Sequence, residues 1–211
     1  MDVTLFPTKG NLILAKNTLA LSKQGYDLMD RKRNILVREM MGLIDEAKEI
    51  QQTISVTFDE AYKALQHTNI VMGISTVEQI GRAIPIEEDI RIRFRSVMGV
   101  ELPVVKYGKK EITPPYGFSR TNSALDEAFV KFMKVKELTL KLAEVETSVY
   151  RLAVNISKTQ KRANSLKNIM IPRYEGLVKN IQEVLDEKER EEFTRLKVIK
   201  KQKDGKKNAS E

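Results

Sequence analysis

Residues 11–50 read NLILAKNTLALSKQGYDLMDRKRNILVREMMGLIDEAKEI, and apolar residues recur along this stretch at alternating steps of three and four. The spacing continues over sixteen positions, of which thirteen are apolar: Leu12, Ala15, Leu19, Ser22, Tyr26, Met29, Arg33, Leu36, Met40, Leu43, Ala47, Ile50, Ile54, Thr57, Ala61 and Ala64. More than seven consecutive heptads indicate a coiled-coil helix. Pro7 presets a helical φ and Thr8 is a candidate cap, so we expect a helix over roughly residues 8 to 70.

A second apolar seam runs through the C-terminal half of the chain. Its positions are Leu138, Leu142, Val145, Val149, Leu152, Ile156, Thr159, Ala163, Leu166, Met170, Tyr174, Leu177, Ile181 and Val184. The two steps that join Leu166, Met170 and Tyr174 are both four, which is a stutter that locally unwinds a coiled coil. Pro172 lies inside this stutter and lacks an N–H, so we predict a bend or a local compliance here. The predicted bend residues are Asn168, Pro172 and Gly176. The alternative is a proline that a straight helix merely tolerates.

The segment between the two seams has a different composition. Four of the six prolines and five of the ten glycines fall between residues 73 and 117, so we expect the long helices to end there. DIRIRFRSV, followed by GVELPVVKY, predicts a β-hairpin that turns near Met98 and Gly99. Pro103 fits only an edge strand, and because two strands alone are marginally stable, we expect the hairpin to pack on the helices or on a partner.

These elements predict a chain dominated by α-helix, folded as a long antiparallel two-helix coiled-coil hairpin with a small β-hairpin at the connecting end. The expected divisions are an N-terminal helix at 1–72, a middle segment at 73–120, a C-terminal helix at 121–201 and a basic, disordered tail at 202–211. If residues near 70 and 121 face each other, Pro172 lies opposite Leu19. Everything after about Asn180 then extends beyond the N-terminal helix.

Composition argues against most enzyme classes. The chain has no cysteine and a single histidine, His67, so it lacks thiolate chemistry and a two-histidine metal motif, and no phosphate-binding loop is present. We therefore predict no catalytic residue, cofactor or metal. The net charge of +8 favours an acidic protein surface, nucleic acid or an anionic membrane as partner, although acids and bases interleave along most of the chain. No apolar run approaches the length of a membrane span, and we expect a soluble, unexported chain.

The C-terminal end of the second helix carries more apolar residues than an isolated helix needs. These are Val184, Leu185, Phe193, Leu196 and Ile199. Ion pairs such as Asp186 with Arg190 and Glu191 with Arg195 contribute only about 0.3 to 0.5 kcal/mol each, whereas ordering the backbone costs about 1 to 2 kcal/mol per residue. The sequence therefore predicts that another protein encloses this segment.

Three sets of residues together resemble a known family. The N-terminal set is Pro7, Thr8, Leu12, Lys16, Leu19, Gly25, Leu28, Lys32, Arg33 and Leu36. The C-terminal set is Arg162, Asn164, Leu166, Ile171, Pro172, Glu189, Arg190, Phe193, Arg195, Leu196 and Lys197. The middle contributes SVMGVELP and YGFSRTNSALDEA, so the match covers most of the chain. In their order and spacing these residues resemble the D subunit of the V-type and A-type ATPases, which is a central-stalk rotor subunit.

The resemblance implies a non-catalytic shaft that couples ion-driven rotation of a membrane ring to ATP synthesis, or ATP hydrolysis to ion transport. The implied partners are the hexamer of catalytic and regulatory subunits, the small F subunit and the socket subunit, with the chain monomeric in a cytoplasmic complex peripheral to the membrane. No direct membrane insertion or nucleic-acid contact is implied. The residues expected to contact the hexamer are Arg162, Arg173, Arg190, Phe193, Arg195, Leu196, Lys197 and Lys200. Two other classes remain open: a basic helical hairpin that binds nucleic acid, and a homodimeric structural coiled coil.

Overall fold

The computed structural model describes residues 6–84, 90–107 and 114–207, and the side chains of these residues except at 120 and 204–207. The chain divides into two units, residues 33–157 and residues 1–32 with 158–211. Helix α1 (Lys9–Met72) and helix α3 (Ser123–Ser165) each contribute to both units. Within the described ranges, no helix combines the length and apolar content needed to cross a bilayer.

Helix α1 begins where its sequence predicts. Thr8 caps it, because the Asn11 amide donates a hydrogen bond of 3.2 Å to Thr8 Oγ1. The predicted apolar seam is the buried side of the helix, and its members Ala15, Leu36 and Ala61 are fully buried. Ser22, a polar member of the seam, is buried and donates its hydroxyl to the Thr18 carbonyl. The heptad interpretation of α1 is confirmed.

In the unit of residues 33–157, the C-terminal part of α1 packs against α3 in antiparallel order. Gln51 lies 3.5 Å from Glu146, and Thr68 donates its hydroxyl to the carbonyl of Ala124 near the start of α3. Thr68 is fully buried there, so this hydrogen bond satisfies a polar group that water does not reach. An edge-to-face contact between Tyr62 and Phe132, with ring centroids 5.7 Å apart, adds to the same interface.

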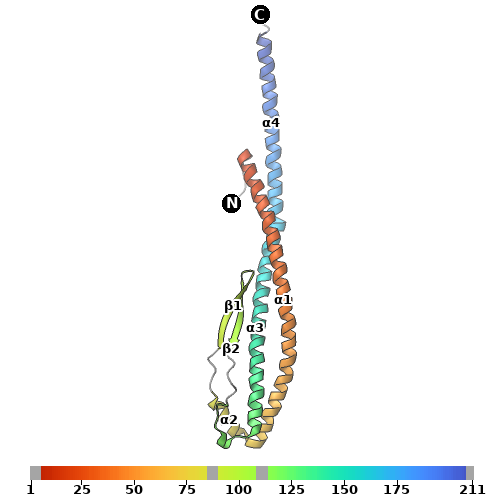
Figure 1. Cartoon of the computed structure of the whole chain (residues 1–211). Coiled ribbons are helices and arrows are strands. Elements are labelled where there is room, and N and C mark those ends of the chain that lie inside the picture. Colours follow the sequence, from red (N-terminus) through yellow and green to blue (C-terminus); the bar gives the residue numbers. More distant parts are fainter. Residues whose placement is uncertain (1–5, 85–89, 108–113, 208–211) are drawn as a thin grey trace. The chain divides into compact units, whose positions relative to one another are not determined.

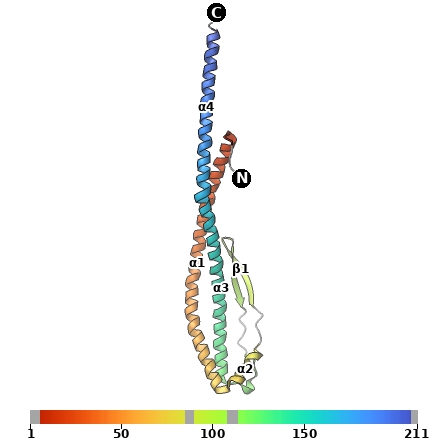
Figure 2. The same cartoon turned by 180° about the vertical axis from the view of Figure 1, so that it is seen from behind.

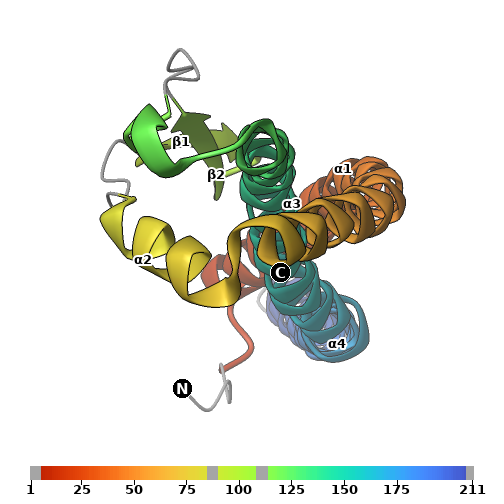
Figure 3. The same cartoon turned by 90° about the horizontal axis from the view of Figure 1, so that it is seen from below.

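One helix in the middle segment was not predicted. Helix α2 (Ile74–Ala83) follows α1 directly; α1 ends at Met72, as expected for a long helix, but this ten-residue helix lies inside the middle segment. Gly73 lies between the two helices, and its φ of 84° changes the direction of the chain before α2 begins. Ile74, Val77 and Ile80 recur at steps of three, a short helical signal that the surrounding glycines obscured. Seen from below, α2 leads away from α1 toward the side on which the hairpin lies (Figure 3).

The predicted β-hairpin is confirmed. Strand β1 (Ile90–Val97) pairs antiparallel with strand β2 (Val100–Tyr107), and the two-residue turn has positive φ at both Met98 (51°) and Gly99 (77°). Such a turn matches the natural twist of paired strands. The hairpin folds back along α3 (Figures 1 and 2). It packs on the helices as expected, and the buried cluster that results consists of Leu36, Val100, Leu102 and Leu152.

In the unit of residues 1–32 and 158–211, the stutter has become a π-helical turn. Residues Leu166–Met170 form this turn, η2, between α3 and helix α4 (Ile171–Lys207), and the Ile171 amide donates to the Leu166 carbonyl. A π turn holds one residue more than an α turn, and two steps of four exceed a heptad by one residue. The turn therefore absorbs the extra residue. Leu166, Met170 and Tyr174 remain partly buried on the side that faces α1.

The predicted pairing of α1 with α4 is wrong by about a turn or more. Lys23 lies 2.7 Å from Glu175, and the Lys167 ammonium lies over the Tyr26 ring, 5.7 Å from its centroid. Pro172 thus lies between the levels of Tyr26 and Lys23, and not opposite Leu19. The stutter adds only one residue to one helix, so it accounts for no more than one residue of this difference.

Two positions on α4 also differ from the expectation: the residue at which it extends past α1 and the residue at which it ends. Lys9, the first residue of α1, lies 2.8 Å from Glu189, so the part of α4 beyond α1 begins at about residue 190 and not at Asn180. Helix α4 continues to Lys207, six residues past the predicted boundary at 201. Lysine is a good helix former, and Gly205 alone did not end the helix. The remainder of the predicted tail, residues 208–211, lies outside the described residues.

Candidate interaction site on the projecting end of α4

The site is the segment of α4 that extends past the start of α1, residues 190–203, which we call the projecting segment. All of its residues are exposed. Its large apolar side chains include Phe193 and Leu196, which are 69% and 65% exposed. At 3.6 residues per turn, Leu196 and Ile199 fall on the same side of α4 as Ile181, which is buried against α1. The apolar seam of the two-helix part therefore continues where α1 is no longer present.

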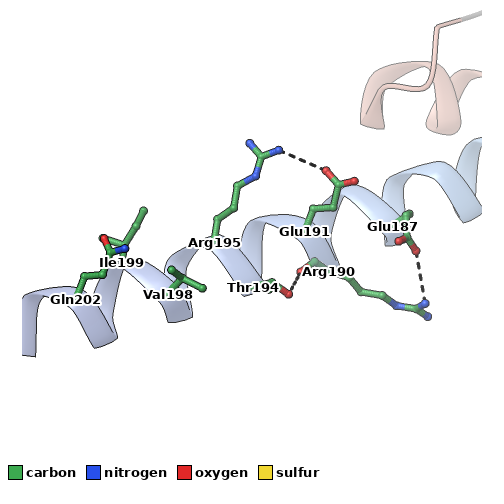
Figure 4. Close-up of a pocket in the computed structure, with 8 residues that line it drawn as sticks. All are labelled: Glu187, Arg190, Glu191, Thr194, Arg195, Val198, Ile199 and Gln202. Atoms are coloured by element: carbon green, nitrogen blue, oxygen red, sulfur yellow. Dashed lines mark hydrogen bonds and ion pairs between the residues drawn. The ribbon is translucent and has the colours of Figure 1, made fainter. Parts of the chain in front are cut away.

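Charge on the projecting segment is unevenly distributed. Six basic and two acidic residues give it a net charge of +4. Figure 4 shows the first turns of this segment, in which Arg195 pairs with Glu191 at 3.6 Å and Arg190 pairs with Glu187 at 3.7 Å. The first of these pairs was predicted, whereas Arg190 was expected to pair with Asp186. Residues 193–203 contain no acidic residue, so their charge is entirely positive.

A shallow depression runs along one side of the segment. Its lining residues are Glu187, Arg190, Glu191, Thr194, Arg195, Val198, Ile199 and Gln202 (Figure 4). All of them belong to one helix, so a small molecule placed there would be covered on one side only. Small-molecule sites enclose most of their ligand's surface. The depression therefore lacks the enclosure of a small-molecule site.

The structure separates the predicted contact residues into two groups. Arg162, in the last turn of α3, and Arg173, on α4, lie on the part that α1 accompanies, and both are exposed. The second group lies together on the projecting segment and consists of Arg190, Phe193, Arg195, Leu196, Lys197 and Lys200. The predicted bend residues Asn168, Pro172 and Gly176 are all exposed and lie within or just after the π turn.

Sequence reasoning missed the contact that defines where the projecting segment begins. The side-chain hydrogen bond and the charge of Glu189 raise the pKa of Lys9, and the same two effects of Lys9 lower the pKa of Glu189. The residues are 180 positions apart, so no local pattern could have joined them. Only the correct pairing of the two helices reveals the contact.

Titratable side chains do not gather into a metal site in the described part of the chain. Across residues 6–84, 90–107 and 114–207, no group of three or more His, Cys, Asp or Glu residues is arranged to hold a metal ion. His67 is exposed near the end of α1. The fold and the site thus define a class of protein: a coiled-coil protein whose C-terminal helix ends in an exposed, partly apolar segment.

Comparison with known proteins makes the class specific. The family model described as the ATP synthase D subunit matches residues 11–201. The V-type ATP synthase D subunit of Thermotoga neapolitana is 46% identical over 198 residues, which cover 94% of this chain and 98% of that protein. The A-type ATP synthase D subunit of Pyrococcus abyssi is 36% identical over 197 residues, 92% of each chain, and that of Methanobrevibacter smithii is 37% identical over 92% of this chain and 85% of its own.

The chain therefore belongs to the ATP synthase D-subunit family. It is a non-catalytic, central-stalk subunit of a rotary ATPase of the V/A type, as its resemblance to that family implied. A match over nearly the whole chain does not favour the nucleic-acid-binding or homodimeric alternatives.

Proposed function

We propose that this subunit is the transmission shaft of its complex and that the projecting segment turns inside the hexamer of catalytic and regulatory subunits. The observation that carries the proposal is that α4 continues past Lys9 with Phe193 and Leu196 uncovered. Rotation of the shaft would couple ion movement through the membrane ring to ATP synthesis, or ATP hydrolysis to ion transport. The subunit itself would bind no nucleotide.

Energetics support an enclosing sleeve around this segment. A single helix in water gains little from exposed pairs such as Arg195 with Glu191, about 0.3 to 0.5 kcal/mol each, while backbone ordering costs about 1 to 2 kcal/mol per residue. Burial of Phe193 and Leu196 by a partner would add about 1.5 to 3 kcal/mol for each side chain. A hexamer that surrounds the helix supplies this burial on all sides.

The charged residues would make the shaft asymmetric. Arg190, Arg195, Lys197 and Lys200 would meet each catalytic subunit in turn and favour one of its open or closed states. Among the residues whose side chains are described, Lys197 and Lys200 form no ion pair, and both would bind acidic groups of the hexamer. Arg162 and Arg173 would contact the hexamer nearer its entrance, at the level where α1 accompanies α4.

The π turn would give the shaft a defined point of compliance. Pro172 removes one backbone hydrogen bond just after η2, and Gly176 follows a turn later with open space where a Cβ would stand. With Asn168 these residues would allow α4 to bend or twist as it passes from the paired part into the sleeve. Such compliance would store part of each rotary step before a catalytic subunit changes state.

The region where α1 meets α2 would bind the rest of the stalk. Around Gly73, where α1 meets α2, Ile70 and Ile74 are 82% and 71% exposed, and Val71 is also uncovered. This apolar elbow is a candidate surface for the socket subunit that joins the shaft to the membrane ring. The small F subunit would bind the two-helix part nearer this end. The shaft would be monomeric in a cytoplasmic complex at the membrane surface.

Site-directed cross-linking tests the proposed enclosure. The chain has no cysteine, so a single Leu196→Cys substitution labels the projecting segment without background. In the assembled complex, a short cross-linker at this site is expected to join the shaft to the hexamer, and a maleimide in solution should react slowly. The matched control is Glu60→Cys, an exposed position of α1 in the other unit. A Leu196→Cys thiol that is as accessible in the complex as in the free protein would contradict the enclosure.

A further inference from the structure

Helix α3 donates and accepts hydrogen bonds at one edge of the β-hairpin, whereas the described residues leave the other edge open. In a hairpin closed by the pair Val97 and Val100, alternate residues direct their N–H and C=O groups outward, away from the partner strand. In β2 the outward residues are Glu101, Pro103, Val105 and Tyr107, and in β1 they are Ile90, Ile92, Phe94 and Ser96. Each set forms one free edge of the sheet.

Side chains of helix α3 form hydrogen bonds with the outward backbone groups of β2. The Val105 amide donates a hydrogen bond of 2.8 Å to Glu144 Oε2, and Arg151 Nη1 donates one of 3.1 Å to the Glu101 carbonyl. Between them stands Pro103, which has no N–H to satisfy. This edge is therefore closed to a further strand, and Pro103 shows that a proline at an outward position leaves the hairpin intact.

The free edge of β1 has no such cover. Within residues 6–84, 90–107 and 114–207, no hydrogen-bond partner is found for the outward groups of Ile92 and Phe94. Every residue of β1 before Val97 is exposed. In the view from below, β2 lies next to α3 and β1 lies beyond it (Figure 3). A strand edge left open in this way is a template for another strand.

The side chains along β1 define what such a strand would look like. On one face, Ile92 and Phe94 are 59% and 56% exposed, and the guanidinium of Arg151 lies over the Phe94 ring, 5.3 Å from its centroid. The other face carries Arg91, Arg93 and Arg95, of which Arg95 pairs with Glu39 at 2.6 Å. Arg91 and Arg93 have no acidic partner among the described residues. A complementary strand would place apolar residues on the first face and acidic residues on the second.

We propose that the free edge of β1 is a docking site for an extended segment of a protein partner in which apolar and acidic residues alternate. The partner segment continues the sheet as a third strand, with backbone hydrogen bonds to Ile92 and Phe94 and ion pairs to Arg91 and Arg93. A second copy of this chain does not fit, because two β1 edges would bring their arginines together. This site lies outside the projecting segment and does not depend on the role proposed for it.

The probe for this site is a synthetic eight-residue peptide of alternating valine and glutamate, with a valine and lysine peptide as its control. Binding to the full chain is followed by fluorescence anisotropy. The glutamate peptide is expected to bind at least ten-fold more tightly than the lysine peptide. On binding, the amides of Ile92 and Phe94 should become protected from hydrogen exchange, while the chain should sediment as a monomer. Absence of binding, or a dimer formed through β1, would overturn the proposal.

Two variants separate the backbone contribution from the charge contribution. Ile92→Pro removes one outward N–H and is expected to weaken binding at least ten-fold, whereas Ile92→Ala keeps that N–H and should weaken it less. The double variant Arg91→Glu with Arg93→Glu changes only exposed side chains, so it tests the site even if the proline variant misfolds. It should reverse the preference toward the lysine peptide. Equal binding by Ile92→Pro and Ile92→Ala, or an unchanged preference in the double variant, would refute strand addition.

Discussion

Lys9 Nζ lies 2.8 Å from Glu189 Oε1, so the first residue of α1 is tied to the point on α4 beyond which the helix runs alone. Both side chains are exposed, and water and salt therefore weaken the contact. The contact marks where the start of α1 lies along α4 and adds little to stability.

The pH dependence of this contact follows from the two pKa shifts. The pKa of Glu189 is lowered by Lys9, so the contact is complete above the ordinary pKa of a glutamate and is lost as pH falls through the lowered value. The pKa of Lys9 is raised, so at the alkaline end the contact is lost as pH rises through that raised value. Between these limits, Glu189→Gln should increase amide exchange in the first turn of α1. Glu192→Gln removes a nearby charge without the hydrogen bond and should have a smaller effect, and equal effects would contradict the account.

The hairpin should be part of the cooperatively folding core of its unit. Leu102 is 2% exposed and lies in one cluster with the fully buried Leu36 and Leu152. Leu102→Ala is expected to lower the free energy of unfolding by about 2 to 5 kcal/mol, measured by urea denaturation. Ile92→Ala on the exposed strand is the control and should change it by no more than about 0.5 kcal/mol. If the two variants unfold alike, the hairpin is not part of the cooperative core.

The hairpin turn carries a residue that its backbone conformation does not favour. Met98 has a φ of 51°, a region in which residues other than Gly, Asn and Asp are strained. Met98→Asn should therefore raise the free energy of unfolding by about 0.5 to 1 kcal/mol, because Asn followed by Gly suits this turn. Gly99, with a φ of 77°, is the converse case, and Gly99→Ala should lower it by about 1 kcal/mol. Thermal or urea unfolding of both variants checks the pair of signs.

The π turn before Pro172 should result from the extra residue and not from the proline. Deletion of Asn168 restores steps of three and four between Leu166, Met170 and Tyr174, so the turn is expected to become α-helical. Pro172→Ala keeps the extra residue and should keep the hydrogen bond from the Ile171 amide to the Leu166 carbonyl. A structure of each variant decides the matter. A π turn that disappears in Pro172→Ala would assign its cause to the proline.

Local patterns were sufficient to predict the elements that repeat or alternate. The heptads from Leu12 to Ala64, the Thr8 cap and the hairpin turn at Met98 and Gly99 all follow from interactions between residues close in sequence. Helix α2 escaped prediction because Gly73 follows the end of α1 and a new helix begins at the next residue. Propensity alone does not distinguish a glycine that ends a helix before a loop from one that separates two helices.

Contacts between distant residues were beyond sequence reasoning. The pairing of Lys9 with Glu189 depends on the full register of two helices, and the π turn shifts that register. The cover on the β2 edge needs Glu144 and Arg151 of α3, which lie 39 and 50 positions from their partners. The projecting segment was predicted from the register of the two helices, and its enclosure from its apolar residues, but its first residue could be located only once Lys9 had a partner.

Rotation of single assembled complexes tests the central claim most directly. The chain is ended after Glu189, which removes the projecting segment and leaves the contact with Lys9 intact, and a chain ended after Lys203 is the matched control. The account predicts that ATP-driven torque falls to a small fraction of its full value in the first complex and stays near normal in the second. Full torque from the complex that lacks the projecting segment would contradict the claim that this helix end transmits rotation.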